Sequence, residues 1–304
     1  MALALSTAWN AFRHDNGEKV LFEIKDLGFK EVELGFNLTA LMIEDIGRVL
    51  KDSSLKIVSL HNYCPVPETF KREDALPDCY SMSSIGKEER QLAVDFTKRS
   101  IDTAASLGAK VLVLHCGRVE IRDRTRDLID LYSRDLKDSQ EFRELRDDTV
   151  KERESLSQTF LENTLKSLEE LNKHAQKAGV LIGVETRFYY SEIPSFDEIG
   201  IILKKFKGSS IFYWHDTGHA QLMENLGFAR HEDYLKQYSK SMIGIHLHDI
   251  LGCQDHMAPG KGSLDFKKFA PFLKKNTVKV IEAHHPATAQ EIIQGRRFLE
   301  EVLE

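Results

Sequence analysis

Cysteine is scarce in this sequence, and no two cysteines have the CxxC spacing of a zinc ribbon or a redox motif. The four cysteines, Cys64, Cys79, Cys116 and Cys253, also lack the density of a small disulfide-bonded domain. We therefore predict free thiols and a cytoplasmic protein. No apolar run approaches bilayer length, and the first residues lack a secretory signal, so no membrane partner is expected.

Linker-like segments and an excess of basic charge are absent too. The seven prolines are spread along the 304 residues, and no Gly-rich or Ser-rich stretch divides the chain, which predicts a single domain over residues 1–304. A hydrophobic content of 41% is enough for one large buried core. The formal net charge of -6 offers no overall attraction to nucleic acid, so a nucleic-acid partner is not expected.

The sequence does contain a series of apolar runs that each end in ionisable residues. The runs end at His61, His115, Glu185, Asp216, His246 to Asp249, and Glu282 to His285. When parallel strands each deliver a polar side chain at the carboxyl end, those side chains share one face of the sheet, which is the active-site face of a closed barrel. Nine of the 12 histidines lie in or just after these runs, which favours a metal centre over scattered surface histidines.

Segments with helical spacing alternate with these runs. Strands are expected to end near residues 9, 36, 61, 115, 185, 216, 250 and 285, and helices to span about 16–27, 40–50, 87–107, 154–179, 196–206, 232–238, 266–274 and 289–303. Eight strands alternating with helices predict an α/β protein with a single (β/α)8 TIM barrel. The polar residues that lead to Gly218 predict that a loop begins after Asp216, and residues 251–266 are predicted to form a loop that contains a flexible Pro-Gly-Lys-Gly turn.

A segment of about residues 118–155 follows the fourth strand and is too long for an ordinary βα loop. Its dense mixed charge predicts helix with many neighbouring opposite charges. Two interpretations stay open: a solvated helical insertion, and a lid over the mouth of the barrel. Arg118 and Arg122 lie nearest the strand exit and are the best placed lid residues.

The DTGH motif at Asp216 to His219 places a carboxylate and an imidazole three residues apart, just after a strand. Both groups are ordinary ligands of divalent metals, so the two can converge on one cation. The alternative is that His219 only caps its own loop. Glu33 points either toward the same site or to solvent, and Arg187 lies on the side of Glu185 if strand geometry persists.

Five motifs together resemble the xylose isomerase-like TIM-barrel superfamily, which includes sugar isomerases and epimerases, inosose and dehydroshikimate dehydratases, and endonuclease IV. They are ETR at Glu185, DTGH at Asp216, HLHD at His246, DHMAPGKG at Asp255 and VIEA at Glu282. The resemblance implies a metal held by Glu185, Asp216, His246 and Glu282. It also implies that His219 binds substrate.

The donor types in that set bear on the metal and the reaction. Three carboxylates and one imidazole suit Mn²⁺, Mg²⁺ or Co²⁺ better than a structural Zn²⁺. We expect an isomerase or epimerase of a sugar or polyol that works through an enediolate, with Glu185 and Glu282 as the acid and base pair. The residues expected to bind substrate are Glu33, His61, His115, Arg187, His219, His248 and His256.

Endonuclease IV is the sharpest alternative within the resemblance. Its zinc ligands imply that His61, His115, His219, Asp255 and His256 could hold additional ions. Against this, ETRFYY stands where that enzyme has an ENTAG-type run, HLHD replaces HLND, and Asp255 and His256 are adjacent. A dehydratase whose Arg118 or Arg187 holds an acid, and a sugar-binding sensor without catalysis, also stay open. We favour a small polyol or keto sugar as partner, and the sequence allows a homo-oligomer.

Overall fold

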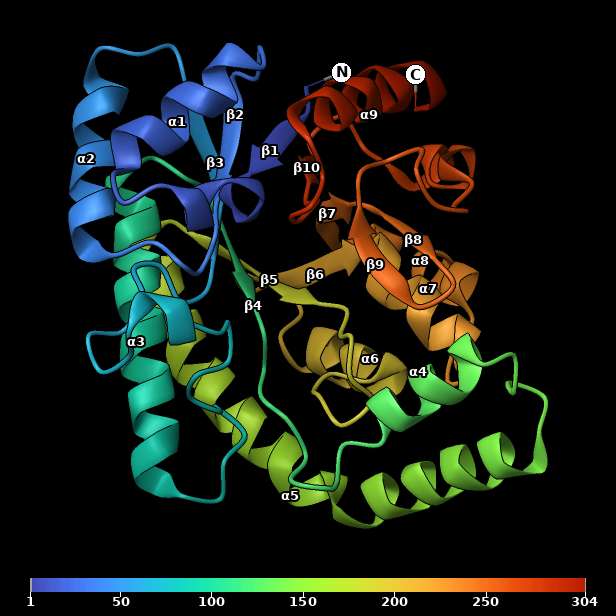
Figure 1. The fold of residues 1–304 in the computed structure, drawn as a ribbon. Helices are drawn as coiled ribbons and strands as arrows, with labels where there is room; N and C mark the ends of the chain where they lie inside the picture. The colour runs from blue at the N-terminus through green and yellow to red at the C-terminus, as the bar shows by residue number, and fades with distance from the viewer. Residues whose placement is uncertain (1, 304) are drawn as a thin grey trace.

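Eight parallel strands form a closed barrel in the computed structural model, which describes residues 2–303 (Figure 1). The strands are β1 (Ala4–Ser6), β2 (Glu31–Leu34), β3 (Lys56–His61), β4 (Val111–Leu114), β5 (Leu181–Glu185), β6 (Ile211–Asp216), β7 (Met242–Leu247) and β10 (Val278–Ile281). Each pairs in parallel with its neighbours, and β10 closes the sheet onto β1. The predicted (β/α)8 barrel is confirmed.

Helices connect successive strands and pack around the barrel. They are α1 (Gly17–Asp26), α2 (Ala40–Lys51), α3 (Lys87–Ser106), α4 (Thr125–Ser133), α5 (Gln140–Ala178), α6 (Phe196–Lys205), α7 (Thr217–Asn225), α8 (His231–Tyr238) and α9 (Ala289–Val302). Polar side chains cap several of them: Asn16 accepts from two amides of α1, and Thr288 and Glu291 form a capping box at α9. Among residues 2–303, no helix is both long and apolar enough to span a membrane.

Three sequence-based predictions of local structure are wrong. Residues 7–9 form a 3-10 helix rather than the end of the first strand. Residues 217–220 begin α7 rather than a loop, because the Asp216 carboxylate caps that helix by accepting the His219 amide at 2.7 Å. Residues 266–274 contain two 3-10 turns instead of a helix, since Pro271 has no amide to donate.

The loop predicted over residues 251–266 is also partly wrong, because its first part belongs to a hairpin. Strands β8 (Asp249–Leu251) and β9 (Gln254–Met257) pair in antiparallel fashion. Asp249 holds the hairpin to the following segment by accepting the amides of Ile250, Gly260 and Leu264. The hairpin carries Asp255 and His256 beside the carboxyl ends of the barrel strands.

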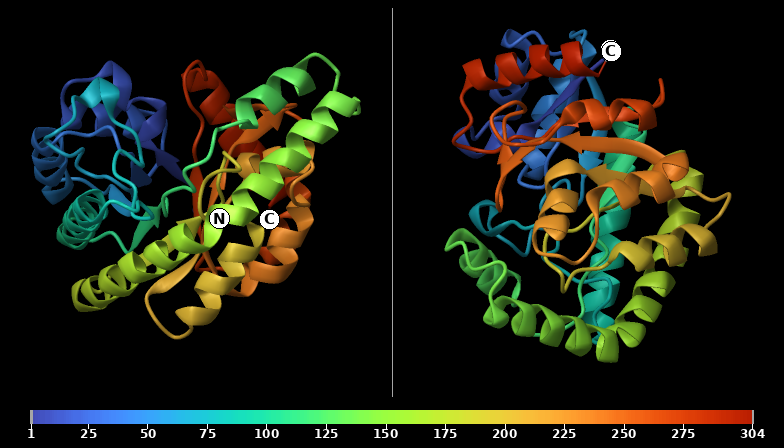
Figure 2. Two further views of the ribbon diagram at one scale, coloured as in Figure 1. Left: turned by 90° about the horizontal axis from the view of Figure 1, so that it is seen from below. Right: turned by 90° about the vertical axis from the view of Figure 1, so that its right-hand side faces the viewer.

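The predicted insertion after β4 is helical, as expected. It consists of α4 and the first part of α5, which runs along the outside of the molecule in both views of Figure 2. Its apolar residues Leu128, Leu131 and Phe142 form one buried cluster with Leu222 of α7 and Ile250 of β8. The insertion is therefore packed onto the barrel wall, and its role as a lid stays a prediction.

One tryptophan fills the barrel interior beneath the strand ends. Trp214 of β6 is buried, and it forms a small core cluster with Ala4, Val111, Val113 and Val280. The strands on both sides carry glycine next to the indole: a Cβ atom built on Gly183 would lie 3.0 Å from Trp214, and one built on Gly244 only 1.9 Å away. The two glycines make the space that the indole occupies.

We predict that Gly244→Ala destabilises the protein by about 3 kcal/mol or more, because the added methyl would overlap the Trp214 ring, which is enclosed in the barrel core and has no room to move. The control is Gly47→Ala in α2, where an added Cβ would meet only Leu107 at 3.8 Å. Alanine is favoured over glycine within helices, so this control should be neutral or stabilising by about 1 kcal/mol. Urea unfolding measures both changes, and equal stabilities of the two variants would contradict the account.

Candidate metal centre

Three carboxylates and one imidazole meet at the carboxyl ends of four strands. Glu185 ends β5, Asp216 ends β6, His246 lies on β7, and Glu282 directly follows β10. Their potential ligand atoms all lie within 4.8 Å of one another. His246 Nδ1 is 2.7 Å from Glu185 Oε1, 2.9 Å from Glu282 Oε2 and 3.6 Å from Asp216 Oδ2. All four side chains are buried.

The orientation of His246 is fixed from behind by Glu33. The His246 Nε2 atom lies 3.0 Å and 3.1 Å from the two Glu33 oxygens, and Ser59 donates to the same carboxylate at 2.7 Å. Because a carboxylate only accepts, Nε2 carries a proton and Nδ1 faces the three ligand carboxylates. Burial opposes protonation of His246, but Glu282 and Glu33 outweigh it and raise its pKa well above the ordinary value. The His246 Nδ1 atom therefore also carries a proton, and this proton lies where a bound cation would lie.

The donor set therefore suits a divalent cation. Three buried carboxylates in contact would repel one another without a positive charge among them. Burial opposes ionisation of Glu185, yet hydrogen bonds from His115 and His246 hold its pKa well below the usual range. Burial also opposes ionisation of Glu282, but His246 and His256 lower its pKa to about 2. The carboxylates are thus ready to bind an ion at neutral pH.

Two further histidines approach the outer oxygen of Glu185. His61 Nε2 lies 3.4 Å and His115 Nε2 lies 2.8 Å from Glu185 Oε2. The Nδ1 atom of His61 donates to the Asn62 carbonyl at 2.9 Å, which leaves its Nε2 atom facing Glu185. Burial opposes protonation of His61, but the hydrogen bond with Glu185 outweighs it and raises the pKa of His61. The same three residues form a second group that could hold an ion. The Nδ1 atom of His115 is buried and has no hydrogen-bond partner among the described residues.

Arg187 competes for the same oxygen of Glu185. Its guanidinium donates to Glu185 Oε2 at 3.0 Å and to Glu192 Oε1 at 2.9 Å. Glu192 is held in turn by Arg153 of α5, which donates to its backbone carbonyl at 2.9 Å and forms a bidentate ion pair with Glu198. Burial lowers the pKa of His115, and the nearby Arg187 charge lowers it further. The positive charge beside this oxygen of Glu185 is therefore the Arg187 guanidinium, which its two ion pairs hold in place.

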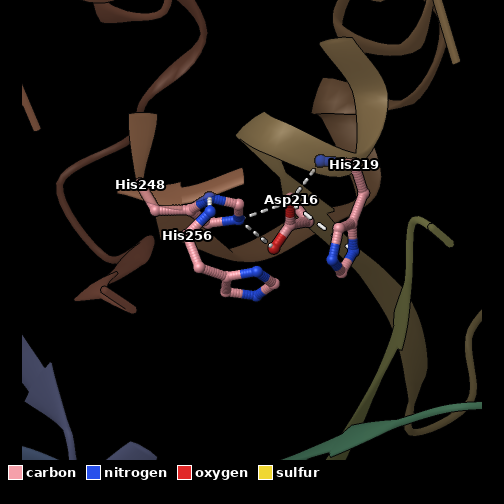
Figure 3. Close-up of side chains that lie close together, drawn as sticks. All are labelled: Asp216, His219, His248 and His256. Carbon is pink, nitrogen blue, oxygen red and sulfur yellow. Dashed lines mark hydrogen bonds and ion pairs between the residues drawn. The ribbon is translucent and has the colours of Figure 1, made fainter. Parts of the chain in front are cut away.

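A third group lies where β6, α7 and the β8–β9 hairpin meet (Figure 3). It comprises Asp216, His219, His248 and His256. His248 Nε2 is 2.9 Å from Asp216 Oδ1, and the His248 and His256 rings are stacked with centroids 4.2 Å apart. Asp255 Oδ2 lies 2.7 Å from His256 Nδ1 and 3.7 Å from His219 Nε2. Burial opposes protonation of His256, but Asp255 raises its pKa to about 9.

A cavity of about 250 Å³ opens beside these groups at the barrel mouth. It is lined by Ala8, Phe12, Phe36, Asn37, His284 and His285. Phe36 contacts His61 edge to face, and His284 stacks on His256 with ring centroids 3.8 Å apart. The walls of the cavity thus also contact the histidines of the candidate centre. A small molecule in this cavity would touch Phe36 and His284, the side chains that pack against His61 and His256.

The structure brings together every residue that the sequence proposed for the site, although their roles stay predictions. Arg118 and Arg122 are different: they lie outside the group and pair with Asp78 and Asp127 at the exposed rim. Sequence reasoning missed Ser59, Glu192 and Arg153, which act through contacts between distant segments. Gly218, which the sequence indicated only as the sign that a strand has ended, is also part of the site, because a Cβ there would lie 2.1 Å from His248.

Comparisons with known proteins agree with this architecture. The chain is 25% identical over 179 residues to an uncharacterised protein, y4fM, of Sinorhizobium fredii, a match that covers 59% of this chain and 47% of that one. A solved L-ribulose 3-epimerase has a TM-score of 0.70, 17% identity and coverage of 100% and 95% of the two chains. The IOLI protein with a bound zinc atom has a TM-score of 0.69, 16% identity and coverage of 100% and 98%.

The two solved structures are too distant in sequence to show more than a shared fold, and the segment matched in y4fM spans about half of that protein. The family match is stronger evidence, because it extends over residues 21–302 and so includes every strand of the barrel except β1. The closed eight-stranded parallel barrel agrees with that match. The chain belongs to the xylose isomerase-like TIM barrel family.

Proposed function

We propose that this protein is a divalent-metal-dependent isomerase or epimerase of a sugar or polyol. The observation that carries the proposal is the buried group of Glu185, Asp216, His246 and Glu282, whose ligand atoms converge within 4.8 Å. The ion, when bound, would polarise a carbonyl and a neighbouring hydroxyl of the substrate. Structural neighbours that include L-ribulose 3-epimerase and D-psicose 3-epimerase support this substrate class.

Glu185 and Glu282 are the residues that we propose to move the proton on carbon. Both are buried and ionised, and they approach His246 Nδ1 from two directions. Arg187 and His115 hold the outer oxygen of Glu185 and would set its direction and basicity. The adjoining cavity is lined by Phe12, Phe36 and His284, which would exclude water from the substrate.

The metal remains part of the proposal. An oxygen-rich set with one imidazole favours Mn²⁺, Mg²⁺ or Co²⁺. Zinc stays open because the IOLI neighbour contains a zinc atom. A dehydratase reaction and simple sugar binding also stay open, as do the predicted cytoplasmic location and any homo-oligomer.

A second candidate function is a multinuclear phosphodiesterase of the endonuclease IV type. The observation in its favour is that two more groups of potential ligands adjoin the first, one at His61 and His115 and one at His219 and His256. We consider it the weaker candidate, because the Arg187 charge lies 3.0 Å from Glu185 Oε2 and would repel a second cation bound at that oxygen.

We predict that Asp216→Asn empties the centre, since the amide removes one of three charges and presents N–H groups to the ion. Elemental analysis of the purified variant should show metal loss by about 10-fold or more. The matched control is Asp249→Asn, a buried carboxylate that accepts only backbone amides. The control should keep its metal and lose stability. Unchanged metal content in Asp216→Asn would refute the ligand assignment.

We predict that Glu185→Gln and Glu282→Gln each abolish exchange of carbon-bound substrate hydrogen with solvent deuterium. NMR with a panel of ketoses that includes tagatose, ribulose and allulose measures this exchange. Glu224→Gln is the control, because Glu224 lies outside the barrel on α7 and accepts the His231 amide. Wild-type exchange in both site variants would show that neither glutamate transfers the proton.

The two candidate functions differ in metal stoichiometry. A sugar isomerase or epimerase with one dominant site should retain about one tightly bound ion per chain after dialysis. A nuclease should hold about three zinc ions per chain and cleave DNA at abasic sites. We expect one ion and no cleavage. Three zinc ions, with cleavage that disappears in His115→Ala, would decide for the nuclease.

A further inference from the structure

We propose that His248 is a positioning residue that orients Asp216 and fixes the neighbouring strand β9 of the hairpin, and that it binds neither metal nor substrate. The inference rests on the proposed function, because Asp216 is taken as a metal ligand. In the group of Figure 3, His248 lies close enough to Asp216, His219 and His256 to be a potential metal ligand, so its role has to be decided from its hydrogen bonds.

The hydrogen bonds of His248 determine its tautomer. The backbone amide of His256 donates to His248 Nδ1 at 2.9 Å. An amide N–H can only donate, so Nδ1 has no proton and its lone pair is used. The neutral ring must then carry its proton on Nε2, which lies 2.9 Å and 3.0 Å from the Asp216 oxygens. His248 therefore donates to Asp216 and has no lone pair left for a cation.

The other histidines around the centre have the opposite arrangement. In His246, His61 and His219, one ring nitrogen faces an acceptor: the Glu33 carboxylate, the Asn62 carbonyl or the Thr186 carbonyl. Each of these partners accepts a hydrogen bond and leaves the second nitrogen facing the ligand group, where it can bind an ion once it has no proton. This is the usual arrangement of a metal-binding histidine. Among these four, only His248 uses its outer nitrogen as an acceptor, so its single proton must point toward the ligand group.

Burial excludes the substrate role as well. His248 has no exposed surface, and its ring packs against Gly218, where an added Cβ would lie 2.1 Å from Cε1. The backbone on both sides is clasped by Thr217, whose hydroxyl donates to the His248 carbonyl at 2.7 Å and accepts its amide at 3.1 Å. Gly218 lies against one edge of the ring and the His256 ring stacks on its face with centroids 4.2 Å apart, so a sugar would have to displace one of these residues to reach it. Gly218 and His248 thus form one interlocked contact between DTGH and HLHD.

The same ring links Asp216 to strand β9 of the hairpin. His256 lies in β9 where the pairing with β8 is irregular, and its left-handed backbone, with φ of 53°, is uncommon for a residue other than glycine. The His256 amide donates to His248 Nδ1, and this hydrogen bond holds the irregular part of β9 in place. This part of β9 carries Asp255 and His256 toward His219. His248 therefore positions a proposed ligand on one side and the hairpin residues on the other.

Two substitutions separate the two hydrogen bonds. In His248→Gln, the side-chain amide N–H lies about where Nε2 was and can still donate to Asp216. In His248→Asn, the side-chain oxygen lies about where Nδ1 was and can still accept the His256 amide, but the side chain is too short to reach Asp216. Titration of chelator-treated full-length protein with Co²⁺ measures the dissociation constant, and visible absorption at saturation reports the cobalt coordination. His231→Asn is a matched control, because His231 is a buried histidine bonded to His215 and Gln221 outside the barrel.

We expect His248→Asn to weaken Co²⁺ binding about 10- to 100-fold, as loss of an orienting partner does, while His248→Gln stays within about threefold of wild type. The saturated absorption spectrum should be the same in both variants, and His231→Asn should bind Co²⁺ like wild type. Wild-type affinity in His248→Asn would overturn the positioning role. A changed spectrum or a lost equivalent of cobalt in both variants would make His248 a ligand instead.

Failure of the proposed function would look different. Wild-type protein that binds no Co²⁺ would contradict the metal centre itself. The ¹⁵N resonances of His248 in the metal-free protein then decide the inference separately, with an unprotonated Nδ1 and a protonated Nε2 expected. A proton on Nδ1 would contradict the hydrogen bonds on which the positioning role depends.

Discussion

The structure depends on one electrostatic constraint: three carboxylates end or follow neighbouring barrel strands and are buried together. Glu185, Asp216 and Glu282 would repel one another in a medium of low dielectric constant, so positive charge must lie among them. The protein supplies part of it through protonated His246 and through Arg187. We propose that a divalent cation, bound in place of the His246 Nδ1 proton, would supply the rest of this positive charge.

The surroundings of the centre are arranged in layers that fix these groups. Glu33 and Ser59 hold His246 from behind, and Trp214 fills the barrel beneath it between Gly183 and Gly244. On the other side, Arg153 connects the long helix α5 to the loop that carries Glu192 and hence to Arg187. The insertion therefore has a structural connection to the site, whether or not it closes over the barrel mouth.

The sequence predicted the parts of this design that are local. Apolar runs ending in His61, Glu185 or Asp216 indicated both the strands and the face they share, because each run carries its own signal. Contacts between distant segments carry no such signal, so the Arg153 clamp and the pairing of Gly218 with His248 were not predicted. The start of α7 was missed because Asp216 serves both as the last strand residue and as the helix cap. The β8–β9 hairpin was missed because its strands are only three and four residues long, too short to show the alternation of a strand.

The central claim is that one cation binds among Glu185, Asp216, His246 and Glu282. Anomalous diffraction at the manganese edge, from crystals of the full chain grown with Mn²⁺, tests this claim most directly. The account predicts one dominant peak, bonded to all four side chains at about 2.0–2.3 Å. Absence of a peak at this position, or a dominant peak between His61 and His115, would contradict the account.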